Sequence, residues 1–475
     1  MPPTTRSQTG SLASLTRSRD SVTHTVHSTG HKTADADLIS IVPSDYTSSD
    51  VPPIYIIDLS LPPSQRYVEV AKDFKLILQN LSSIFDDLLE EVNLPKRTFH
   101  WICRILLHRL HSKEQTEELR GISKVIDIPM YLLIAYNVLL DLFMGCTSGG
   151  IVVKEPGQRR KMLHFRTLDW GMPELRKVII QFEYKNKTDG PTIARSIGYA
   201  GFVGILTGAR PGLSLSLNFR PYHNNDSSRR ANFRFYAHQV LVLLGFRPSI
   251  SSILRSYMLP SPCRKGWNPF TRTKVTTGHT EHVAIVLQAL PSIPTTSCYI
   301  TLSDGTHTCV LEKDLRTANL LSSTTFIAVT NHDVAYEKQE EKTDHTNPVP
   351  HSKQQSLGGT GMQDIVDESI TRKLLLCQKW EKRVASLQQR RKLSITVQND
   401  GGKGLAAGEL EGSQNCYVRM EKLRKWLLEY PITNPDTHFV VVMDGEEGEF
   451  VWVRSFEKSM YEELEMDDQS IDEVV

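Results

Sequence analysis

The sequence has few of the features that mark whole classes of protein. Its seven cysteines are widely spaced and include no Cys-x-x-Cys pair, which argues against a disulfide framework and against a cysteine-rich zinc site. Its 55 Lys and Arg residues nearly balance its 54 Asp and Glu residues, so the basic excess typical of nucleic-acid-binding proteins is missing. We therefore predict no nucleic-acid partner, no metal site and no cofactor.

The sequence also has no hydrophobic run long enough to cross a membrane. Its most apolar stretch, residues 130–144, carries Asn137 and Asp141 and is shorter than the ~20 apolar residues that a transmembrane helix needs, so we expect a buried helix there. The first residues hold no apolar segment of the roughly 7–15 residues that a secretory signal needs. The absence of a signal favours a cytoplasmic location.

Composition divides the chain into three parts. Nineteen of the first 50 residues are Ser or Thr and the apolar residues there are scattered, so we predict a disordered tail over residues 1–50. Residues 51–145 begin with a strand pattern at 54–61 and continue with helical patterns at 65–91, 95–111, 115–124 and 127–143. Residues 146–475 form the third part, in which polar, aperiodic segments near 337–361 and 398–414 are predicted to be inserted surface loops.

The third part alternates β-like and helical runs. Strands are expected at 150–153, 161–166, 178–184, 192–197, 202–207, 213–218, 298–302, 308–311 and 326–330, with a hairpin at 439–443 and 450–453. Helices are expected at 231–244, 249–258, 282–290, 367–393 and 423–430. This order predicts an α+β protein with layered sheets and helices outside them.

One cysteine has chemically interesting surroundings. Cys146 follows the apolar helix, and a lone cysteine is more often a small buried hydrophobic residue than a nucleophile. Here, however, Arg166 and Asp169 follow at the end of a strand, where a local ion pair is the simpler reading. A glycine-dense strand region leading to Asn218, and then Asn331, come further on. The widespread motifs GxSxG, HExxH, GxxxxGK[ST] and GxGxxG are absent.

In this order and spacing, the motifs resemble the acid ceramidase and N-acylethanolamine-hydrolysing acid amidase family. The resemblance is carried by Cys-Thr-Ser at 146–148, Arg-x-x-Asp at 166–169, Gly-Tyr-x-Gly-x-x-Gly-x-x-Thr-Gly at 198–208 and Thr-Asn-x-Asp at 330–333, with support at 55–63 and 118–129. It covers about residues 52–333, with a weaker echo at 433–454. These proteins are N-terminal-nucleophile (Ntn) hydrolases, so the resemblance implies an αββα sandwich. Residues 51–145 would be a helical α-subunit segment and residues 146–475 a catalytic β-subunit.

The resemblance also implies that the chain cleaves itself between Gly145 and Cys146. Cys146 would then be the nucleophile, and its newly freed α-amino group, with a pKa of ~7.7–8.0 in the reference state, would be the base. By the same resemblance, Asp169 orients this amine, Arg166 favours the thiolate, and Asn331 helps to form the oxyanion hole.

Two further residues are candidates for contacts to the oxyanion or the substrate. Asn218 matches a polar group near the oxyanion in relatives, and its alternative role is that of a turn residue at a strand end. The sequence departs from the family just after it, because Phe219 stands where many relatives carry Glu. Arg372 is the candidate for an Arg that relatives carry in an Asp-Asp-Arg-Arg segment, at a shifted position.

The implied reaction is hydrolysis of an N-acyl lipid, for example ceramide to a fatty acid and a sphingoid base, with transient contact to a membrane surface. The alternatives are an N-acylethanolamine or another acyl amide as substrate, or a non-enzymatic relative with the same fold. The α and β chains of one precursor are expected to stay associated. Cys103 is the only cysteine before the cleavage site, so the chains would be held by packing alone. The resemblance favours a lysosome-like location, in contrast to the cytoplasmic one.

Overall fold

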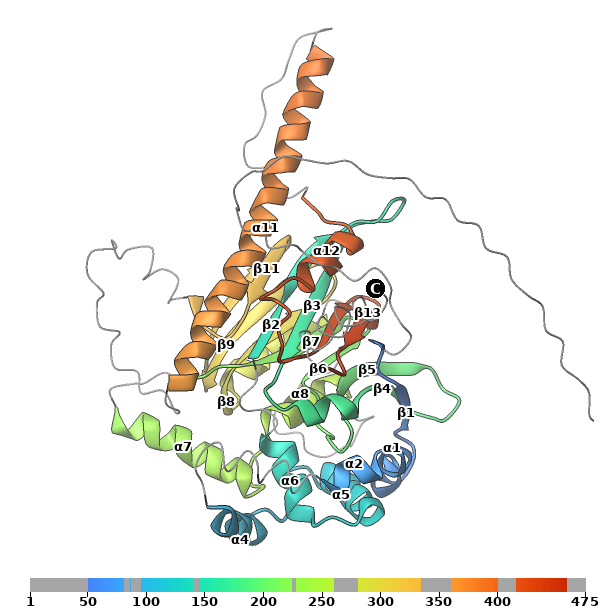
Figure 1. The fold of residues 1–475 in the computed structure, drawn as a ribbon, viewed down its shortest axis with the longest axis vertical. Helices are drawn as coiled ribbons and strands as arrows, with labels where there is room; N and C mark the ends of the chain where they lie inside the picture. Colours follow the sequence, from blue (N-terminus) through green and yellow to red (C-terminus); the bar gives the residue numbers. More distant parts are fainter. Residues whose placement is uncertain are drawn as a thin grey trace, which may run out of the picture. The chain divides into compact units, whose positions relative to one another are not determined.

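The structure of the chain is a computed structural model that describes residues 50–80, 86, 95–139, 145–223, 228–259, 281–334, 360–399 and 416–458 (Figure 1). All of them lie within one compact unit, Val42–Val475. The tail predicted over residues 1–50 lies outside the described residues except for Asp50. The same holds for the two predicted loops, apart from the few residues that they share with a long helix. Among the described helices, none combines the length and apolarity needed to span a membrane.

Two β-sheets form the centre of this unit. The larger has eight strands in the order β1-β4-β5-β6-β7-β8-β9-β10, and the smaller has five in the order β11-β2-β3-β12-β13. The strands are β1 (Ile54–Asp58), β2 (Gly145–Val153), β3 (Lys161–Asp169), β4 (Ile179–Lys185), β5 (Thr192–Tyr199), β6 (Thr207–Arg210), β7 (Leu213–Phe219), β8 (Thr295–Ser303), β9 (Thr308–Leu315), β10 (Thr317–Ser323), β11 (Phe326–Val329), β12 (Thr437–Asp444) and β13 (Glu449–Ser455). All named pairs are antiparallel except β1 with β4, so the first part of the chain supplies a parallel edge strand to the larger sheet.

Helices come from every part of the chain. They are α1 (Val68–Asp73), α2 (Lys75–Gln79), α4 (Lys96–Leu106), α5 (Lys113–Ile126), α6 (Met130–Leu139), α7 (Arg229–Leu243), α8 (Ile250–Met258), α9 (Glu281–Ala289), α11 (Thr360–Asn399) and α12 (Met420–Leu427), with short 3-10 helices at Pro63–Gln65, Pro173–Val178 and Leu290–Ser292. Local sequence explains several boundaries. Ser112 caps α5 by accepting a hydrogen bond from the backbone of Gln115, and α5 ends at Asp127 in the left-handed region.

The two sheets face each other and bury a common core. Leu168 of β3, Leu217 of β7 and Val441 of β12 belong to one buried apolar cluster. Helices α11 and α12 pack on the other face of the five-stranded sheet, where Phe165 lies in a second cluster with Trp426. Helices α7 and α8 lie against β8 and β6 of the eight-stranded sheet, and α6 packs into the same buried cluster as its strands (Figure 1). The layer order of helices, sheet, sheet and helices confirms the predicted αββα sandwich.

The structure corrects several predicted boundaries. The strand expected at 150–153 begins earlier, at Gly145, so Cys146 lies inside it and not before it. The helix expected from 65 through 91 is interrupted at Phe74, and its part after Asn80 lies outside the described residues except for Asp86. Residues 202–206 are not a strand, and β6 starts only at Thr207. Strand β10 was not predicted, because its exposed, polar sequence carries no clear alternation.

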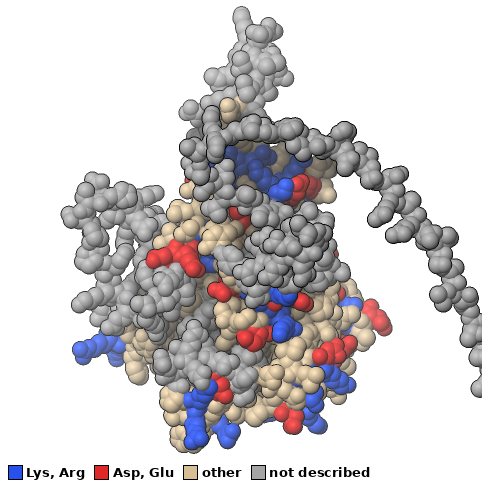
Figure 2. Space-filling model, in the orientation of Figure 1, with Lys and Arg blue, Asp and Glu red and all other residues tan. Residues whose placement is uncertain are grey.

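Charged residues are distributed over the surface as the composition predicts. Figure 2 shows Lys and Arg side chains interspersed with Asp and Glu over the described part of the visible face. This mixture agrees with the formal net charge of +1 and leaves no single-sign field across that face.

Candidate active site

Cys146 is fully buried in strand β2, at the interface of the two sheets. Its backbone nitrogen donates a hydrogen bond of 2.9 Å to Oδ1 of Asn331. The Gly145–Cys146 peptide bond pairs across the sheet with residues Asp169 and Leu168 of β3. The predicted cleavage site therefore lies between the first two residues of β2, in the five-stranded sheet and paired with β3.

Arg166 contacts the Cys146 thiol. Its Nη2 lies 3.3 Å from Sγ, while Nη1 donates to the backbone oxygen of Leu217 and lies 3.3 Å from Oδ1 of Asn218. The guanidinium is fully buried, and the described residues include no carboxylate paired with it. Burial raises the pKa of the Cys146 thiol, and the positive charge of Arg166 opposes that rise. In the uncut chain the effect of burial is the larger.

Asp169 and Arg372 form a buried ion pair beside the same peptide bond. Arg372 extends from α11, and its Nη2 also donates to Oδ1 of Asn331 over 3.0 Å. Thr437 donates to Oδ1 of Asp169 over 2.7 Å. Burial raises the pKa of the Asp169 carboxyl, and the nearby Arg372 lowers it. A Cβ added to Gly145 would lie 3.3 Å from the Cβ of Asp169, so the carboxylate packs directly against the residue before the cysteine.

The side chain of Asn331 has a fixed orientation. Its Oδ1 accepts hydrogen bonds from the Cys146 backbone and from Arg372, and its Nδ2 donates to the backbone oxygen of Phe219 over 2.7 Å. Its backbone nitrogen donates to Oγ of Ser369, one helical turn before Arg372 on α11. Since an amide presents one acceptor and one donor end, these contacts leave no freedom for a flip.

Asn218 lies within strand β7 and faces the other sheet, so it is not a turn residue. Its Nδ2 lies 3.4 Å from the backbone oxygen of Cys146 and 3.2 Å from that of Thr330. Its Oδ1 accepts a 2.6 Å hydrogen bond from Ser148. The structure therefore brings all the candidate residues together around one peptide bond. They are Gly145, Cys146, Arg166, Asp169, Asn218, Asn331 and Arg372.

Sequence reasoning missed four neighbours of these residues. Ser148 and Ser369 bond to Asn218 and Asn331, Thr437 bonds to Asp169, and His164 lies two residues before Arg166 on the same face of β3. The spacing Ser369-x-x-Arg372 places both side chains on one helix face, so it could have indicated that Ser369 lies near the site together with Arg372. Thr437 lies 268 residues from its partner, so no local pattern indicates that contact.

Within the described parts of the chain, no group of three or more His, Cys, Asp or Glu side chains is arranged to hold a metal ion. Six cysteines fall in those parts, five of them buried. The site thus offers a thiol, two guanidinium groups, one carboxylate and two amides.

The comparisons with known proteins point to one family. Residues 50–111 match the family model described as the beta subunit of N-acylethanolamine-hydrolyzing acid amidase, although this stretch lies before Cys146. Acid ceramidase of Heterocephalus glaber is 28% identical over 205 residues, which are 40% of this chain and 50% of the relative. The N-acylethanolamine-hydrolyzing acid amidase of Caenorhabditis elegans is 31% identical over 177 residues, 35% of this chain and 47% of the relative.

The matches are partial. The chain spans about half the length of the curated relatives it matches. A solved structure of the Caenorhabditis elegans N-acylethanolamine-hydrolyzing acid amidase ortholog aligns with 63% of this chain and 93% of its own, at 19% identity. Its TM-score of 0.35 is too low to support an argument about the fold. Parts of the chain are thus similar in sequence to members of the acid ceramidase and N-acylethanolamine-hydrolysing acid amidase family, the resemblance that the motifs around Cys146 indicated.

Proposed function

We propose that the chain is an Ntn cysteine amidohydrolase that cleaves itself before Cys146 and then hydrolyses the amide bond of an N-acyl lipid. The observation that carries this proposal is a pair of contacts to Cys146, one at its sulfur and one at its backbone nitrogen. Arg166 contacts its sulfur and Asn331 accepts from its backbone nitrogen, the two atoms that an Ntn hydrolase uses as nucleophile and base. The relatives named acid ceramidase and N-acylethanolamine-hydrolyzing acid amidase support the same reaction class.

Self-cleavage would proceed by transfer of an acyl group to the thiol. The sulfur of Cys146 attacks the carbonyl carbon of Gly145, the carbon–nitrogen bond breaks, and the departing nitrogen takes up the thiol proton. Water then hydrolyses the thioester, leaving a carboxylate on Gly145 and a free thiol and α-amino group on Cys146. Asp169 packs against Gly145, and its ion pair with Arg372 holds it beside the peptide bond that breaks.

The new amine would serve as the base for turnover. The nitrogen of Cys146 already lies 2.9 Å from Oδ1 of Asn331, so this amide oxygen would orient the amine. The amine takes the thiol proton, and the sulfur attacks the substrate carbonyl. The carbon–nitrogen bond of the substrate then breaks, and the amine product leaves with the proton that the α-amino group returns to it. Arg166 stabilises negative charge on sulfur. Water then releases the fatty acid from the acyl-enzyme.

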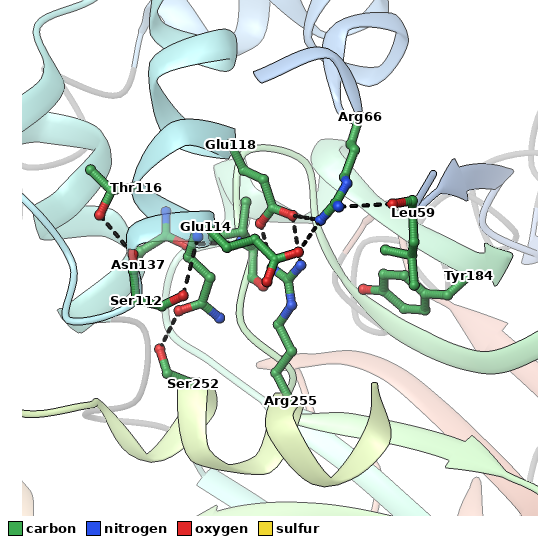
Figure 3. A network of polar contacts seen from close by, with 12 residues as sticks. Leu59, Arg66, Ser112, Glu114, Thr116, Glu118, Asn137, Tyr184, Ser252 and Arg255 are labelled. Carbon is green, nitrogen blue, oxygen red and sulfur yellow. Dashed lines mark hydrogen bonds and ion pairs between the residues drawn. The ribbon is translucent and has the colours of Figure 1, made fainter. Parts of the chain in front are cut away.

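The two chains would remain associated through a buried polar contact that we call the clamp, formed by Arg66, Glu118 and Arg255 (Figure 3). Glu118 of α5 receives hydrogen bonds of 2.6 and 2.7 Å from Arg255 of α8 and one of 3.0 Å from Arg66. Asn137 of α6 adds a 2.9 Å hydrogen bond to the backbone oxygen of Gly201. Together with the pairing of β1 and β4, these contacts link residues before and after the cleavage site without a disulfide.

A basic apolar surface on α4 and α7 fits transient contact with an anionic membrane. Trp101 is 65% exposed on α4 and Phe233 is 72% exposed on α7, although both are large and apolar. Residues 96–109 and 229–247 include eight Lys or Arg and no acidic residue. The two segments meet where Arg109 lies over the ring of Phe246, 5.6 Å from its centroid. Apolar side chains flanked by cations are typical of interfacial membrane binding, which would bring a lipid substrate to the enzyme.

The first test is the intact mass of the full-length chain beside Cys146→Ala across pH. We expect fragments of residues 1–145 and 146–475 in the wild type alone. The cut protein should then release fatty acid from N-acyl amides, and a panel of ceramide, N-acylethanolamine and acyl-amino-acid substrates ranks the alternatives. A wild-type chain that stays uncut at every pH, or a cut chain that hydrolyses none of these amides, would overturn the proposal in favour of a non-enzymatic relative.

Membrane contact is tested separately. The wild type and Trp101→Ser/Phe233→Ser are spun down with vesicles of phosphatidylcholine alone or mixed with phosphatidylserine. We expect the wild type to sediment with the anionic vesicles and the variant to stay in solution. Equal sedimentation of both proteins would rule out this surface as the contact.

A further inference from the structure

Four buried polar side chains form a line between the two sheets and end at the candidate active site. His164 of β3 lies 2.9 Å from Oγ of Ser216 on β7, whose hydroxyl lies 3.0 Å from Oγ of Ser148 on β2. The Ser148 hydroxyl donates to Oδ1 of Asn218 over 2.6 Å. All four side chains are essentially inaccessible to solvent, so no bulk water competes for these hydrogen bonds.

The imidazole of His164 is neutral. Burial and the positive charge of Arg166 lower the pKa of His164 from 6.5 to about 3. A neutral imidazole has one donor nitrogen and one acceptor nitrogen. His164 therefore bonds to the hydroxyls of Ser214 and Ser216 with opposite roles at its two nitrogens.

The acceptor at the far end decides the direction of the line. Oδ1 of Asn218 only accepts, so Ser148 must donate to it, and the oxygen of Ser148 is then free to accept from Ser216. With its proton used in this way, Ser216 accepts from Nε2–H of His164. Nδ1 then accepts from the Ser214 hydroxyl over 3.0 Å, in place of the backbone oxygen of Ser303, which lies 3.3 Å from the same hydroxyl. In the opposite tautomer the Ser216 proton turns toward His164, and Ser148 loses its donor. One tautomer alone gives a continuous line toward the site.

We propose that His164 is a positioning residue, which acts through Ser216 and Ser148 to hold the amide of Asn218 and thereby the guanidinium of Arg166 beside the Cys146 sulfur. Asn218 is the junction, because its Oδ1 accepts from Ser148 and Arg166 while its Nδ2 faces the backbone oxygen of Cys146. Losing the Ser148 hydroxyl removes one of the two donors to Oδ1 of Asn218 and thereby loosens one of the contacts that position Arg166. The inference rests on the proposed function, since it concerns the reactivity of the same cysteine.

The chain offers a matched pair of substitutions. Ser148→Ala breaks the line between His164 and Asn218, whereas Ser214→Ala removes a buried serine hydroxyl on the opposite side of the same imidazole. Full-length chains are made by cell-free translation, and the cleaved fraction is followed over time between pH 4.5 and 8. We expect Ser148→Ala to slow cleavage on the order of tenfold and Ser214→Ala to stay within about twofold of wild type.

The pH dependence separates positioning from packing. If the Arg166 guanidinium moves away from Sγ of Cys146, the pKa of the thiol rises. The pH of half-maximal cleavage should therefore move upward in Ser148→Ala and not in Ser214→Ala. His164→Gln retains an amide donor and should cleave faster than His164→Phe. Equal slowing by the two serine variants, or an unshifted pH profile in Ser148→Ala, would overturn the inference.

A second readout keeps this test separate from the proposed function. If the wild type does not cleave, the proposed function fails, and the inference is then judged from alkylation of Cys146 by iodoacetamide. Mass spectrometry of the peptide containing residue 146 gives the alkylation rate at each pH. A higher pH midpoint in Ser148→Ala than in Ser214→Ala supports the inference, and equal midpoints overturn it.

Discussion

Two arginines, both buried between secondary-structure layers, have opposite surroundings. Arg255 lies in the clamp and forms two hydrogen bonds with the carboxylate of Glu118 and a third with the backbone oxygen of Val203. Arg166 lies at the candidate active site, where its described neighbours are a thiol, an amide oxygen and a backbone oxygen, with no paired carboxylate.

The difference assigns the two charges different tasks. A buried cation with a bidentate carboxylate has its desolvation offset, and removing its partner is destabilising. The charge of a buried cation without a carboxylate is not compensated by a paired anion, so it stabilises any nearby group that becomes negative. The clamp is therefore expected to contribute to stability, and Arg166 to the reactivity of Cys146.

The largest expected effect comes from breaking the clamp. Glu118→Gln removes the carboxylate that Arg66 and Arg255 share. Arg66 keeps its ion pair with Glu114, whereas the buried guanidinium of Arg255 loses its bidentate carboxylate. We expect the free energy of unfolding in urea to fall by about 3–5 kcal/mol, while the fraction that stays folded still cleaves at Cys146.

A control variant tests the reason for that loss. Glu118→Leu/Arg255→Met removes both ends of the main ion pair and replaces them with apolar groups, which is generally milder than stranding a charge. Its unfolding free energy should lie between those of the wild type and Glu118→Gln. A double variant less stable than the single one would contradict the assignment of the clamp.

Arg166→Met should show the reverse pattern. We expect the rate of self-cleavage, followed by intact mass, to fall by roughly 10²–10³ because the charge that stabilises the thiolate is gone. The thermal midpoint should stay the same or rise, because the variant removes a buried charge that has no carboxylate partner. Arg166→Lys keeps the charge and should retain part of the rate. Equal loss of stability in Arg166→Met and Glu118→Gln would remove the distinction between the two arginines.

Local patterns in the sequence were enough to predict the layer order and most elements. Apolar periodicity indicated α5, α6 and α8, and alternation indicated β4 and β7, because their apolar residues recur at the helix or strand period. The patterns failed where the sequence has no such period. Exposed β10 shows no alternation, and residues 145–149 of β2 are mostly small residues with little strand propensity, held in the sheet by β3 and β11.

The candidate site divides in the same way. Cys146, Arg166, Asp169 and Asn331 were named from motifs, and the fold brings them into contact. The roles of Thr437 and Ser369 depend on contacts between segments far apart in the chain, which no window of sequence contains. His164 lies only two residues before the Arg-x-x-Asp motif, yet its part in the line to Asn218 depends on the register of three strands in two sheets.

The pH dependence of stability sharpens the comparison, because buried His438 lies in a neutral hydrogen bond whereas the clamp is an ion pair. His438 bonds to the hydroxyl of Tyr199 over 2.8 Å, and burial lowers the pKa of His438 from 6.5 to about 3. Between these values the unfolded chain binds a proton that the folded chain does not. Stability from this group is therefore present above about pH 6.5 and is lost as pH falls toward 3.

Replacing both partners isolates that contribution. Tyr199→Phe/His438→Phe should flatten the dependence of the unfolding free energy on pH by up to about 1.4 kcal/mol per pH unit between pH 6 and 4. Tyr199→Phe alone keeps the histidine and should keep the wild-type slope. Urea titrations at several pH values give these slopes. A double variant as acid-sensitive as the wild type would show that His438 is not held neutral.

The smallest expected effect is that of one methyl group at the cleavage site. In Gly145→Ala the new Cβ lies 3.3 Å from the Cβ of Asp169 and 3.5 Å from Nη1 of Arg372, so the ion pair must shift by a few tenths of an ångström. We expect cleavage to slow by less than about tenfold, equivalent to under about 1.4 kcal/mol in the barrier. Gly171→Ala is the matched control, since no atom lies within 4 Å of its added Cβ. If the two variants cleave at the same rate, the packing of Asp169 against Gly145 has no part in the reaction. If Gly145→Ala alone cleaves slowly and its unfolding free energy is unchanged, Gly145 behaves as Arg166 does and not as the clamp does. The change then lowers the cleavage rate and leaves stability intact.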